Sequence, residues 1–142
     1  MSKVVQFPRP PYLRLRQVAA ADGTGVITKW LKQYPAARAR FRVRVEYLAK
    51  FPDTEWNIKQ FKRLGGGLSE IKWEADKPFR ALGFYKGGYF VMVLGCTHKQ
   101  DVYDPSNCIE TAKKRMKEAQ HGYWNIVDYD LLPPQEPNSG VA

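Results

Sequence analysis

The clearest pattern of hydrophobic and polar positions lies in residues 68–99 and predicts three antiparallel strands. Residues 68–74 alternate strictly, with Ser69, Ile71 and Trp73 on one face. Residues 79–85 and 89–96 flank a Gly-Gly pair, which is suited to the two-residue loop of a tight hairpin. The second of these runs is apolar on both faces, as is typical of a strand in the middle of a sheet.

The hairpin loop also predicts which residues lie opposite one another. If Lys86 pairs with Tyr89, counting back places Arg80 opposite Gly95. Because side chains alternate with a period of two, Lys99 should then share the face of Arg80, and Gly95 should leave space beside the guanidinium. The pattern therefore predicts a cationic pocket at the end of the sheet, formed by Arg80, Lys99 and Lys72.

Weaker patterns surround this region. Residues 12–19 alternate and are typical of a first strand at the edge of a sheet. Thr24 is the expected N-cap of a helix over residues 26–33. Asp104, followed by a proline, is the expected N-cap of a helix over residues 106–121.

Residues 36–51 fit two structures. Phe41, Val43 and Val45 alternate with charged residues, and this pattern alone favours a strand. However, Ala37, Phe41, Val45 and Leu48 also lie on one stripe of a helix, and the segment is long for a strand.

Composition adds a charge asymmetry to this picture. The 142 residues fit one domain and carry a net charge of +9. Residues 1–65 hold 14 Lys or Arg and 4 Asp or Glu, a balance of +10, whereas residues 66–142 have a balance of −1. A basic half of this kind indicates a polyanion or an acidic protein as partner, and we expect nucleic acid.

The same composition indicates where the protein acts. There is no apolar run long enough to span a membrane and no signal peptide, so we expect a cytoplasmic protein without a membrane partner. Cys96 and Cys108 are too few for a disulfide framework and should be reduced there.

Several short motifs resemble the RelE/HigB superfamily of bacterial toxins, and within it the phage-derived HigB-like branch. The matching segments are GLSEIK (67–72), FRAL (79–82), VLGCTHK (93–99), Pro105 and IETAKKR (109–115). The resemblance implies an α+β fold, with a RelE-like, twisted, mainly antiparallel sheet, two N-terminal helices packed on it and a C-terminal helix. It thus favours a helix for residues 36–51.

The resemblance also implies a division of the chain. The toxin domain would span residues 12–122, after a loose N-terminal extension over residues 1–11. Residues 123–142 would form an aromatic and acidic C-terminal tail whose first residues dock on the domain and whose end is disordered.

Members of the superfamily cut messenger RNA on the ribosome by driving a ribose 2′-hydroxyl at the adjacent phosphate. This reaction needs a base, an acid and cations that neutralise the pentacoordinate phosphate, and requires no metal or other cofactor. By its place in the motifs, Arg80 would stabilise the transition state, Lys99 would hold phosphate, and Lys72 would assist.

The acid and base are less well defined by the sequence. Glu70 is either the base or an ion-pair partner of Lys72 or Arg80. His98 has the appropriate ordinary pKa, although strict alternation points it away from Arg80. Tyr103 could stack on a base or donate a proton.

The resemblance further implies a set of partners. These are the ribosome and mRNA, and a cognate antitoxin of the helix-turn-helix type that alone contacts operator DNA. The residues expected to bind RNA are Arg38, Arg42, Lys59, Lys62 and Arg63. Several relatives have a second basic residue where this chain has Gln100.

Three other interpretations compete with this one. A non-catalytic module of phage or mobile-element origin would keep the fold and bind RNA or a host protein without cutting. A DNA-binding module would also be basic, but no recognition helix is apparent. The spacing of Cys96, His98, Cys108 and His121 matches no standard zinc site, so we expect no metal.

Overall fold

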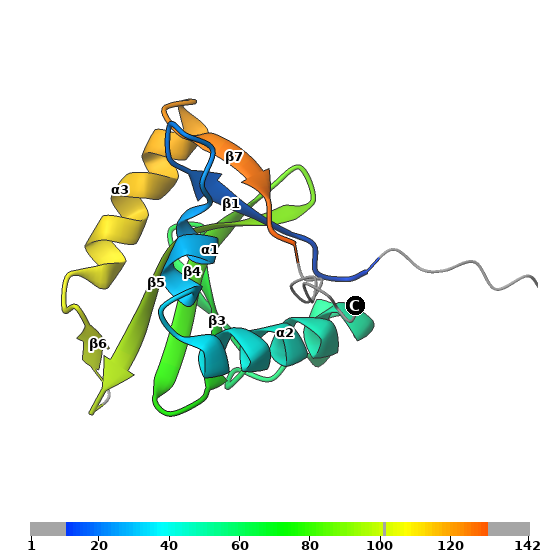
Figure 1. Ribbon diagram of the computed structural model, residues 1–142. Coiled ribbons are helices and arrows are strands. Elements are labelled where there is room, and N and C mark those ends of the chain that lie inside the picture. The colour runs from blue at the N-terminus through cyan, green and yellow to red at the C-terminus, as the bar shows by residue number, and fades with distance from the viewer. Residues whose placement is uncertain (1–10, 101, 131–142) are drawn as a thin grey trace, which may run out of the picture.

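The computed structural model describes residues 11–100 and 102–130. They form a mixed α+β fold with one seven-stranded sheet and three α-helices (Figure 1), which confirms the predicted fold class. The strands are β1 (Leu15–Ala19), β2 (Phe61–Gly65), β3 (Leu68–Glu74), β4 (Pro78–Lys86), β5 (Tyr89–Lys99), β6 (Val102–Asp104) and β7 (Asn125–Asp128). The helices are α1 (Val26–Leu31), α2 (Pro35–Lys50) and α3 (Cys108–Gln120), with a short 3-10 helix, η1 (Asp53–Glu55).

The sheet is open and almost entirely antiparallel. Its strand order is β2-β3-β4-β5-β1-β7, and β6 also pairs with β5. Only β1 and β5 run parallel. Because β1 pairs with the first part of β5 and β6 with its last part, β6 extends the sheet at the end of β5.

The central meander forms as the alternation predicts. Gly87 and Gly88 have φ of 59° and 84°, a backbone conformation in which a side chain would be strained. Lys86 lies opposite Tyr89, as expected. The turn chemistry of this hairpin was therefore readable from the sequence.

The register further along this hairpin differs from the prediction. The pairing is regular to Gly83 and Met92, but Leu82 then lies opposite Leu94, so that Val93 is an extra residue in β5. This β-bulge shifts the pairing by one position, and Arg80 lies opposite Cys96 rather than Gly95. The predicted register at this end of the sheet is wrong.

Residues 35–50 are helical, so the alternation within them does not mark a strand. The stripe of Ala37, Phe41, Val45 and Leu48 is buried, whereas Val43 is 65% exposed. A strand would have placed Val43 on the same face as Phe41 and Val45. The helix is favoured because all four buried side chains reach the core from one face.

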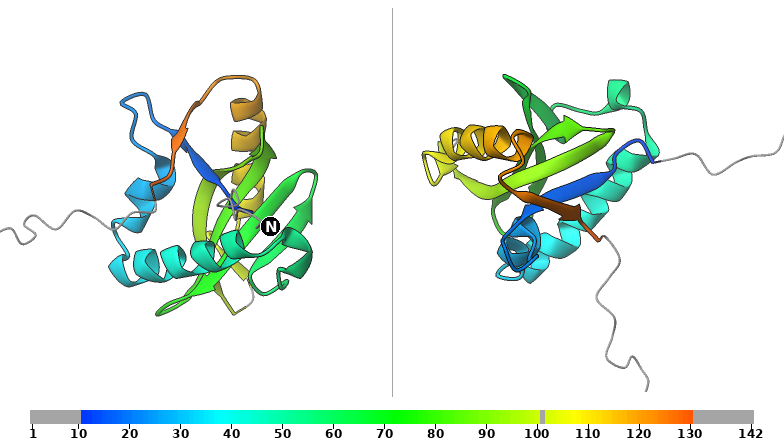
Figure 2. Two further views of the ribbon diagram at one scale, coloured as in Figure 1. Left: turned by 90° about the vertical axis from the view of Figure 1, so that its right-hand side faces the viewer. Right: turned by 90° about the horizontal axis from the view of Figure 1, so that it is seen from above.

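The helices cover opposite faces of the sheet (Figures 1 and 2). Helices α1 and α2 bury Ile27, Leu31 and Phe41 in one core, together with Trp73 and Phe79 of the sheet. Helix α3 covers the other face and contributes to a second core. This core consists of Val18, Leu68, Leu82, Phe84, Val91, Val93, Cys96, Cys108, Ala112, Met116 and Ala119.

Two predicted helix caps are wrong. Helix α1 has Gly25 as its N-cap, and its first free N–H groups, those of Ile27 and Thr28, donate to the Oε1 of buried Gln17 on β1. Helix α3 begins after Asn107 instead of Asp104, since Asp104 ends β6. In each case a tertiary contact or a neighbouring strand decides where the helix begins.

Strand β1 is not at an edge, because β7 pairs with it in antiparallel fashion. Ile126 and Trp124 pack against the core beneath α3, and Tyr129 lies 5.5 Å from the ring of Phe41 on the opposite face. Tyr123, by contrast, is 79% exposed. Part of the expected tail thus docks on the sheet; the expectations for residues 1–10 and 131–142 lie outside the described residues.

Candidate functional site

The face of the sheet that carries α3 brings together most of the side chains singled out in the sequence. Register pairs Lys62 with Glu70, and Lys72 with Arg80, across three neighbouring strands. Directly opposed residues share a face, so all four lie on the same side of the sheet. Three cations and one carboxylate therefore form a row from β2 to β4.

The centre of this row is a buried ion pair. Glu70 is 2% exposed and Arg80 is 7% exposed, and the Arg80 Nε lies 3.9 Å from the Glu70 Oε1. This Nε has no hydrogen-bond partner among the described residues, while one terminal nitrogen of Arg80 donates to the Phe79 carbonyl at 2.8 Å. The guanidinium is thus held beside the carboxylate without a close hydrogen bond between them.

Tyr103 on β6 completes this cluster. Its hydroxyl donates to the Glu70 Oε1 at 2.7 Å, across 33 residues of chain. Burial, followed by the hydrogen bond to the Glu70 carboxylate, raises the pKa of Tyr103. The phenol therefore stays protonated and remains a donor to Glu70 at all physiological pH values.

His98 lies on the same face, contrary to the prediction from strict alternation. Because the bulge at Val93 places Cys96 opposite Arg80, the side chain two residues later, His98, points to the same side. Its ring packs edge-on against Tyr103, with ring centres 4.3 Å apart and planes at 86°. An imidazole, a phenol, a carboxylate and a guanidinium are thus gathered on this face, around the buried ion pair.

Lys99 is placed differently from the expectation. The register that puts Cys96 and His98 on the face of Arg80 puts Lys99 on the opposite face, at the exposed end of β5. Gly95 also faces that side, where a Cβ would collide with the indole of Trp30. The space at Gly95 therefore accommodates a tryptophan of α1, not the Arg80 guanidinium, and the prediction of a pocket shared by Arg80 and Lys99 is wrong.

Lys72 is the half-buried cation of the row. Burial, and next the nearby Arg80 guanidinium, lower the pKa of Lys72. Its backbone carbonyl accepts a 2.8 Å hydrogen bond from Arg44 of α2, which fixes the strand at this point from the other side of the sheet. Lys72 and Arg80 therefore form a pair of neighbouring cations on the α3 face.

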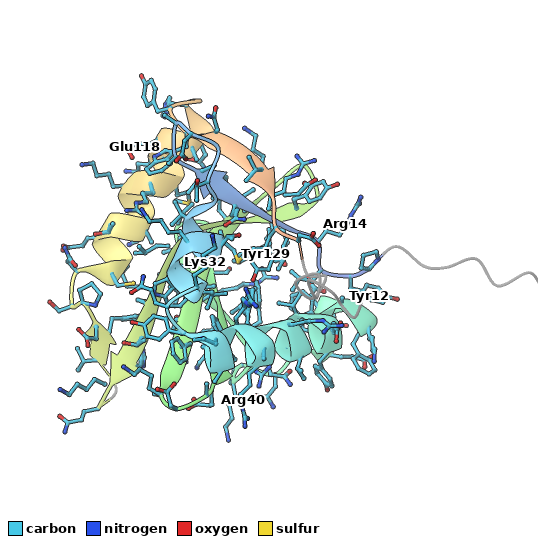
Figure 3. All side chains as sticks on the ribbon, viewed as in Figure 1. Tyr12, Arg14, Lys32, Arg40, Glu118 and Tyr129 are labelled. Atoms are coloured by element: carbon cyan, nitrogen blue, oxygen red, sulfur yellow. The ribbon has the colours of Figure 1, made fainter. Side chains whose placement is uncertain are left out.

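The expected RNA-binding residues do not form one patch. Arg42 is paired with Glu46 one helical turn away at 3.1 Å, and half-buried Arg38 lies on the same helix. Lys62 joins the row described above, whereas the strand alternation places Arg63 on the other face of β2. Exposed Lys59 precedes β2. On α2, exposed Arg40 projects away from the sheet (Figure 3).

Arg115 of α3 is a residue that the sequence did not mark as part of the site. Its guanidinium donates to the Val93 carbonyl at 3.0 Å and stacks on Trp124, 5.3 Å from the ring centre. Arg115 thus contacts the extra residue of the bulge that sets the register of His98. Its place in the IETAKKR motif was the available signal, but the partner could not be inferred from it.

The two cysteines contact each other beneath this face. Cys96 of β5 and Cys108 at the start of α3 are both buried and free, and the hydrogen bond between their side chains is the main cause that raises the pKa of Cys96. Among the described residues no three His, Cys, Asp or Glu side chains are grouped to hold a metal ion. Cys96 and Cys108 therefore act as small core side chains.

Comparison with known protein families matches residues 29–117, more than half of the chain, to phage-derived Gp49-like proteins (DUF891). The chain belongs to this Gp49-like family. The family is part of the RelE/HigB-like toxin superfamily, in agreement with the resemblance carried by the motifs. The matched segment contains every residue of the row and its neighbours His98 and Tyr103.

No individual relative adds to the assignment to the Gp49-like family. Neither the curated proteins nor the solved structures contain a match to this chain. None of the helices in residues 11–100 and 102–130 has the length and apolar character needed to cross a membrane.

Proposed function

We propose that this Gp49-like protein is the toxin of a type II toxin–antitoxin pair, of the HigB-like branch, and that it cleaves mRNA on the ribosome. The observation that carries the proposal is the row of Lys62, Lys72 and Arg80 on one sheet face, which also carries Glu70, His98 and Tyr103. Clustered cations next to groups that can exchange protons suit an attack of a 2′-hydroxyl on phosphate.

In this mechanism the side chains supply both charge and protons. A base takes the proton of the ribose 2′-hydroxyl, the 2′-oxygen attacks the adjacent phosphorus, and the bond from phosphorus to the 5′-oxygen breaks. The leaving oxygen takes a proton from an acid, which gives a 2′,3′-cyclic phosphate and a 5′-hydroxyl. Lys72 and Arg80 neutralise the pentacoordinate phosphate, and His98 is the acid or base best placed beside them.

Glu70 is occupied in the resting protein, because it pairs with Arg80 and accepts the Tyr103 hydroxyl. Its first role is therefore to hold Arg80 and Tyr103 in position. Lys62 and Lys72 are the more accessible cations and meet the RNA first. Arg80 lies next to Lys72 on the same face and is buried beside Glu70.

The partners follow from the same proposal. A cognate helix-turn-helix antitoxin would mask the α3 face and would alone contact the operator DNA. The protein itself would act in the cytoplasm on ribosome-bound mRNA.

The burial of Arg80 favours a second candidate function. An arginine that is 7% exposed and paired with a carboxylate can be purely structural, as in many protein cores. A non-catalytic member with this fold would then bind RNA or a host protein without cutting.

Induced expression in a bacterial host, followed by primer extension on an abundant transcript, distinguishes the two candidates. We expect the wild type to arrest growth and to give translation-dependent cuts, and Lys72→Ala and Arg80→Lys to reduce cutting at least about tenfold. Arg80→Lys is preferred to Arg80→Ala, because deletion of the guanidinium would leave the Glu70 carboxylate buried without its ion-pair partner.

The matched control is Lys32→Ala at the C-cap of α1, on the far side of the sheet from α3 (Figure 3), which should cut like the wild type. Far-UV circular dichroism establishes that each variant is folded. If folded wild-type protein is harmless and leaves transcripts whole, the non-catalytic candidate replaces the nuclease.

A further inference from the structure

A second feature with the character of a binding site lies away from the α3 face. Between η1, β2 and the end of β4 there is a pocket of about 180 Å³, lined by Asp53, Trp56, Ile58, Phe61, Arg63 and Tyr85. This volume is below the roughly 300–1,000 Å³ of pockets for drug-sized ligands, and suits a single small ring system.

The walls of this pocket are aromatic and firmly held. The Trp56 indole N–H donates to the carbonyls of Leu48 and Phe51 at 2.9 and 2.8 Å, which ties it to the end of α2. Trp56 lies 4.9 Å from Phe61, and Phe61 lies 6.3 Å from Tyr85, measured between ring centres. The aromatic surface is therefore formed before any ligand arrives.

The rim of the pocket carries opposite charges that are free to change partners. Arg63 and Asp53 form a 3.8 Å ion pair, and their side chains are 80% and 56% exposed. An exposed ion pair of this kind contributes little to stability, so its two groups can turn to a ligand at small cost. Burial, and next the Asp53 carboxylate, raise the pKa of Tyr85 to about 12, so its hydroxyl is a donor at neutral pH.

The mouth of the pocket exposes apolar surface among cations. Ile58 is 63% exposed and Tyr85 is 48% exposed, although both are large side chains. Exposed Lys59 and Lys86 are their direct neighbours in the chain. Exposed aromatic and apolar side chains next to cations are typical of surfaces that bind single-stranded nucleic acid.

We propose that this pocket binds one unpaired base of a single-stranded RNA. The base stacks on Tyr85 against the Trp56 and Phe61 wall, Arg63 turns to a neighbouring phosphate, and Asp53 accepts hydrogen bonds from N–H groups of the base. A second hollow shares Arg63 and Tyr85 with this pocket and is also lined by the side-chain-free Gly65 and Gly67, which leaves room for the next nucleotide.

A protein side chain is the less suitable occupant. A hydrophobic anchor would be expected to meet an apolar pocket without charges at its centre. Here a carboxylate, a guanidinium and a phenol hydroxyl surround the opening, and these groups match the donors, acceptors and phosphate of a nucleotide. The inference deepens the proposed function, since RNA is the substrate class in both.

The test is binding of a fluorescent, unstructured RNA of about ten nucleotides, followed by anisotropy, together with a duplex of the same sequence. Wild-type protein should prefer the single strand. Tyr85→Ala should weaken single-strand binding by between about 5- and 150-fold, the effect of losing one stacked base, and should abolish the preference. Tyr85→Trp should retain it. The control is Tyr123→Ala, which removes a tyrosine that is 79% exposed elsewhere and should bind as the wild type.

A second measurement uses salt. Arg63→Gln should make the slope of log affinity against log salt shallower by about 0.7, the contribution of one phosphate contact to single-stranded RNA. Equal affinity of the wild type for duplex and single strand, or wild-type binding by Tyr85→Ala, would overturn the proposal. So would a result in which Tyr85→Ala impairs binding of a co-expressed antitoxin but not of RNA.

These outcomes separate the two proposals. If transcripts stay whole in cells but Tyr85-dependent RNA binding is observed, the nuclease proposal fails and the base pocket stands. If transcripts are cut by Tyr85→Ala and wild type alike and binding is unchanged, the pocket proposal fails and the nuclease stands.

Discussion

Replacing Tyr103 by phenylalanine tests the buried cluster on the α3 face. The change removes one oxygen and leaves the ring that packs against His98. Its energetic effect comes from the lost 2.7 Å hydrogen bond to Glu70, whose side chain is only 3% exposed and cannot recruit water in exchange. A hydrogen bond to a buried charge contributes about 1.5–3 kcal/mol, so the free energy of unfolding should fall by about that amount.

The assay is urea denaturation followed by circular dichroism, carried out as a double-mutant cycle with Glu70→Gln. A neutral amide acceptor makes a hydrogen bond worth only about 0.5–1.5 kcal/mol, so Tyr103→Phe should cost less when residue 70 is glutamine. The resulting coupling of about 1–2 kcal/mol identifies the Tyr103–Glu70 contact itself as the source of the loss.

The matched control is Tyr123→Phe, which removes a hydroxyl from a tyrosine that is 79% exposed and should change stability by less than about 0.5 kcal/mol. If Tyr103→Phe is as stable as the wild type, or if its cost is the same with Glu70→Gln, the Glu70 carboxylate is held by other donors. The argument that Tyr103 positions Glu70 beside Arg80 would then be refuted.

Three further predictions concern the rest of the fold. Gly95→Ala should destabilise the protein by about 1–3 kcal/mol in urea denaturation, because the added Cβ would meet the Trp30 indole. Adding Trp30→Leu in the same chain should recover part of the lost stability. The free energy of unfolding should fall as pH rises from 10.0 to about 12, because Tyr85 and Tyr129 have pKa values of about 12 in the folded state, whereas an ordinary tyrosine has a pKa of 10.0. Absorbance at 295 nm follows the ionisation of the tyrosines, and thermal unfolding follows the stability. A stability that does not change over this pH range would contradict the prediction. In primer extension, Lys99→Ala should reduce transcript cutting less than Lys72→Ala, since Lys99 faces away from Arg80. An equal loss of cutting would show that strand register does not decide which lysine contributes to cleavage.

Much of the fold can be predicted from local sequence patterns, because each of these patterns fits only one kind of secondary structure. The strict alternation of residues 68–74 and the Gly87-Gly88 loop define β3 and the β4–β5 hairpin without help from distant residues. Helix α2 was harder to predict, since its arginines alternate with apolar residues as in a strand. Only its length and its helical stripe of apolar residues favour the correct structure.

The arrangement of the site was harder to predict, because it depends on one bulged residue that the local sequence does not indicate. In an apolar run such as that of β5, nothing in the sequence distinguishes a bulged valine from a regular one, yet the bulge at Val93 reverses the faces of His98 and Lys99. The contacts that accompany this geometry, Arg115 with the Val93 carbonyl and Gly95 under Trp30, join residues far apart in the chain. Long-range partners of this kind are also why the role of Gln17 in capping α1 was not foreseen.

The bulge at Val93 also has a consequence for how this family can change. If Val93 paired regularly with Leu82, every later residue of β5 would move by one position, and an ammonium group would replace the imidazole beside Arg80 without substitution of any side chain of the site. Whether the strand bulges before the site is therefore itself a chemical variable. Two Gp49-like chains with the same basic residues, one with this bulge and one with regular pairing, would present different side chains beside the same arginine.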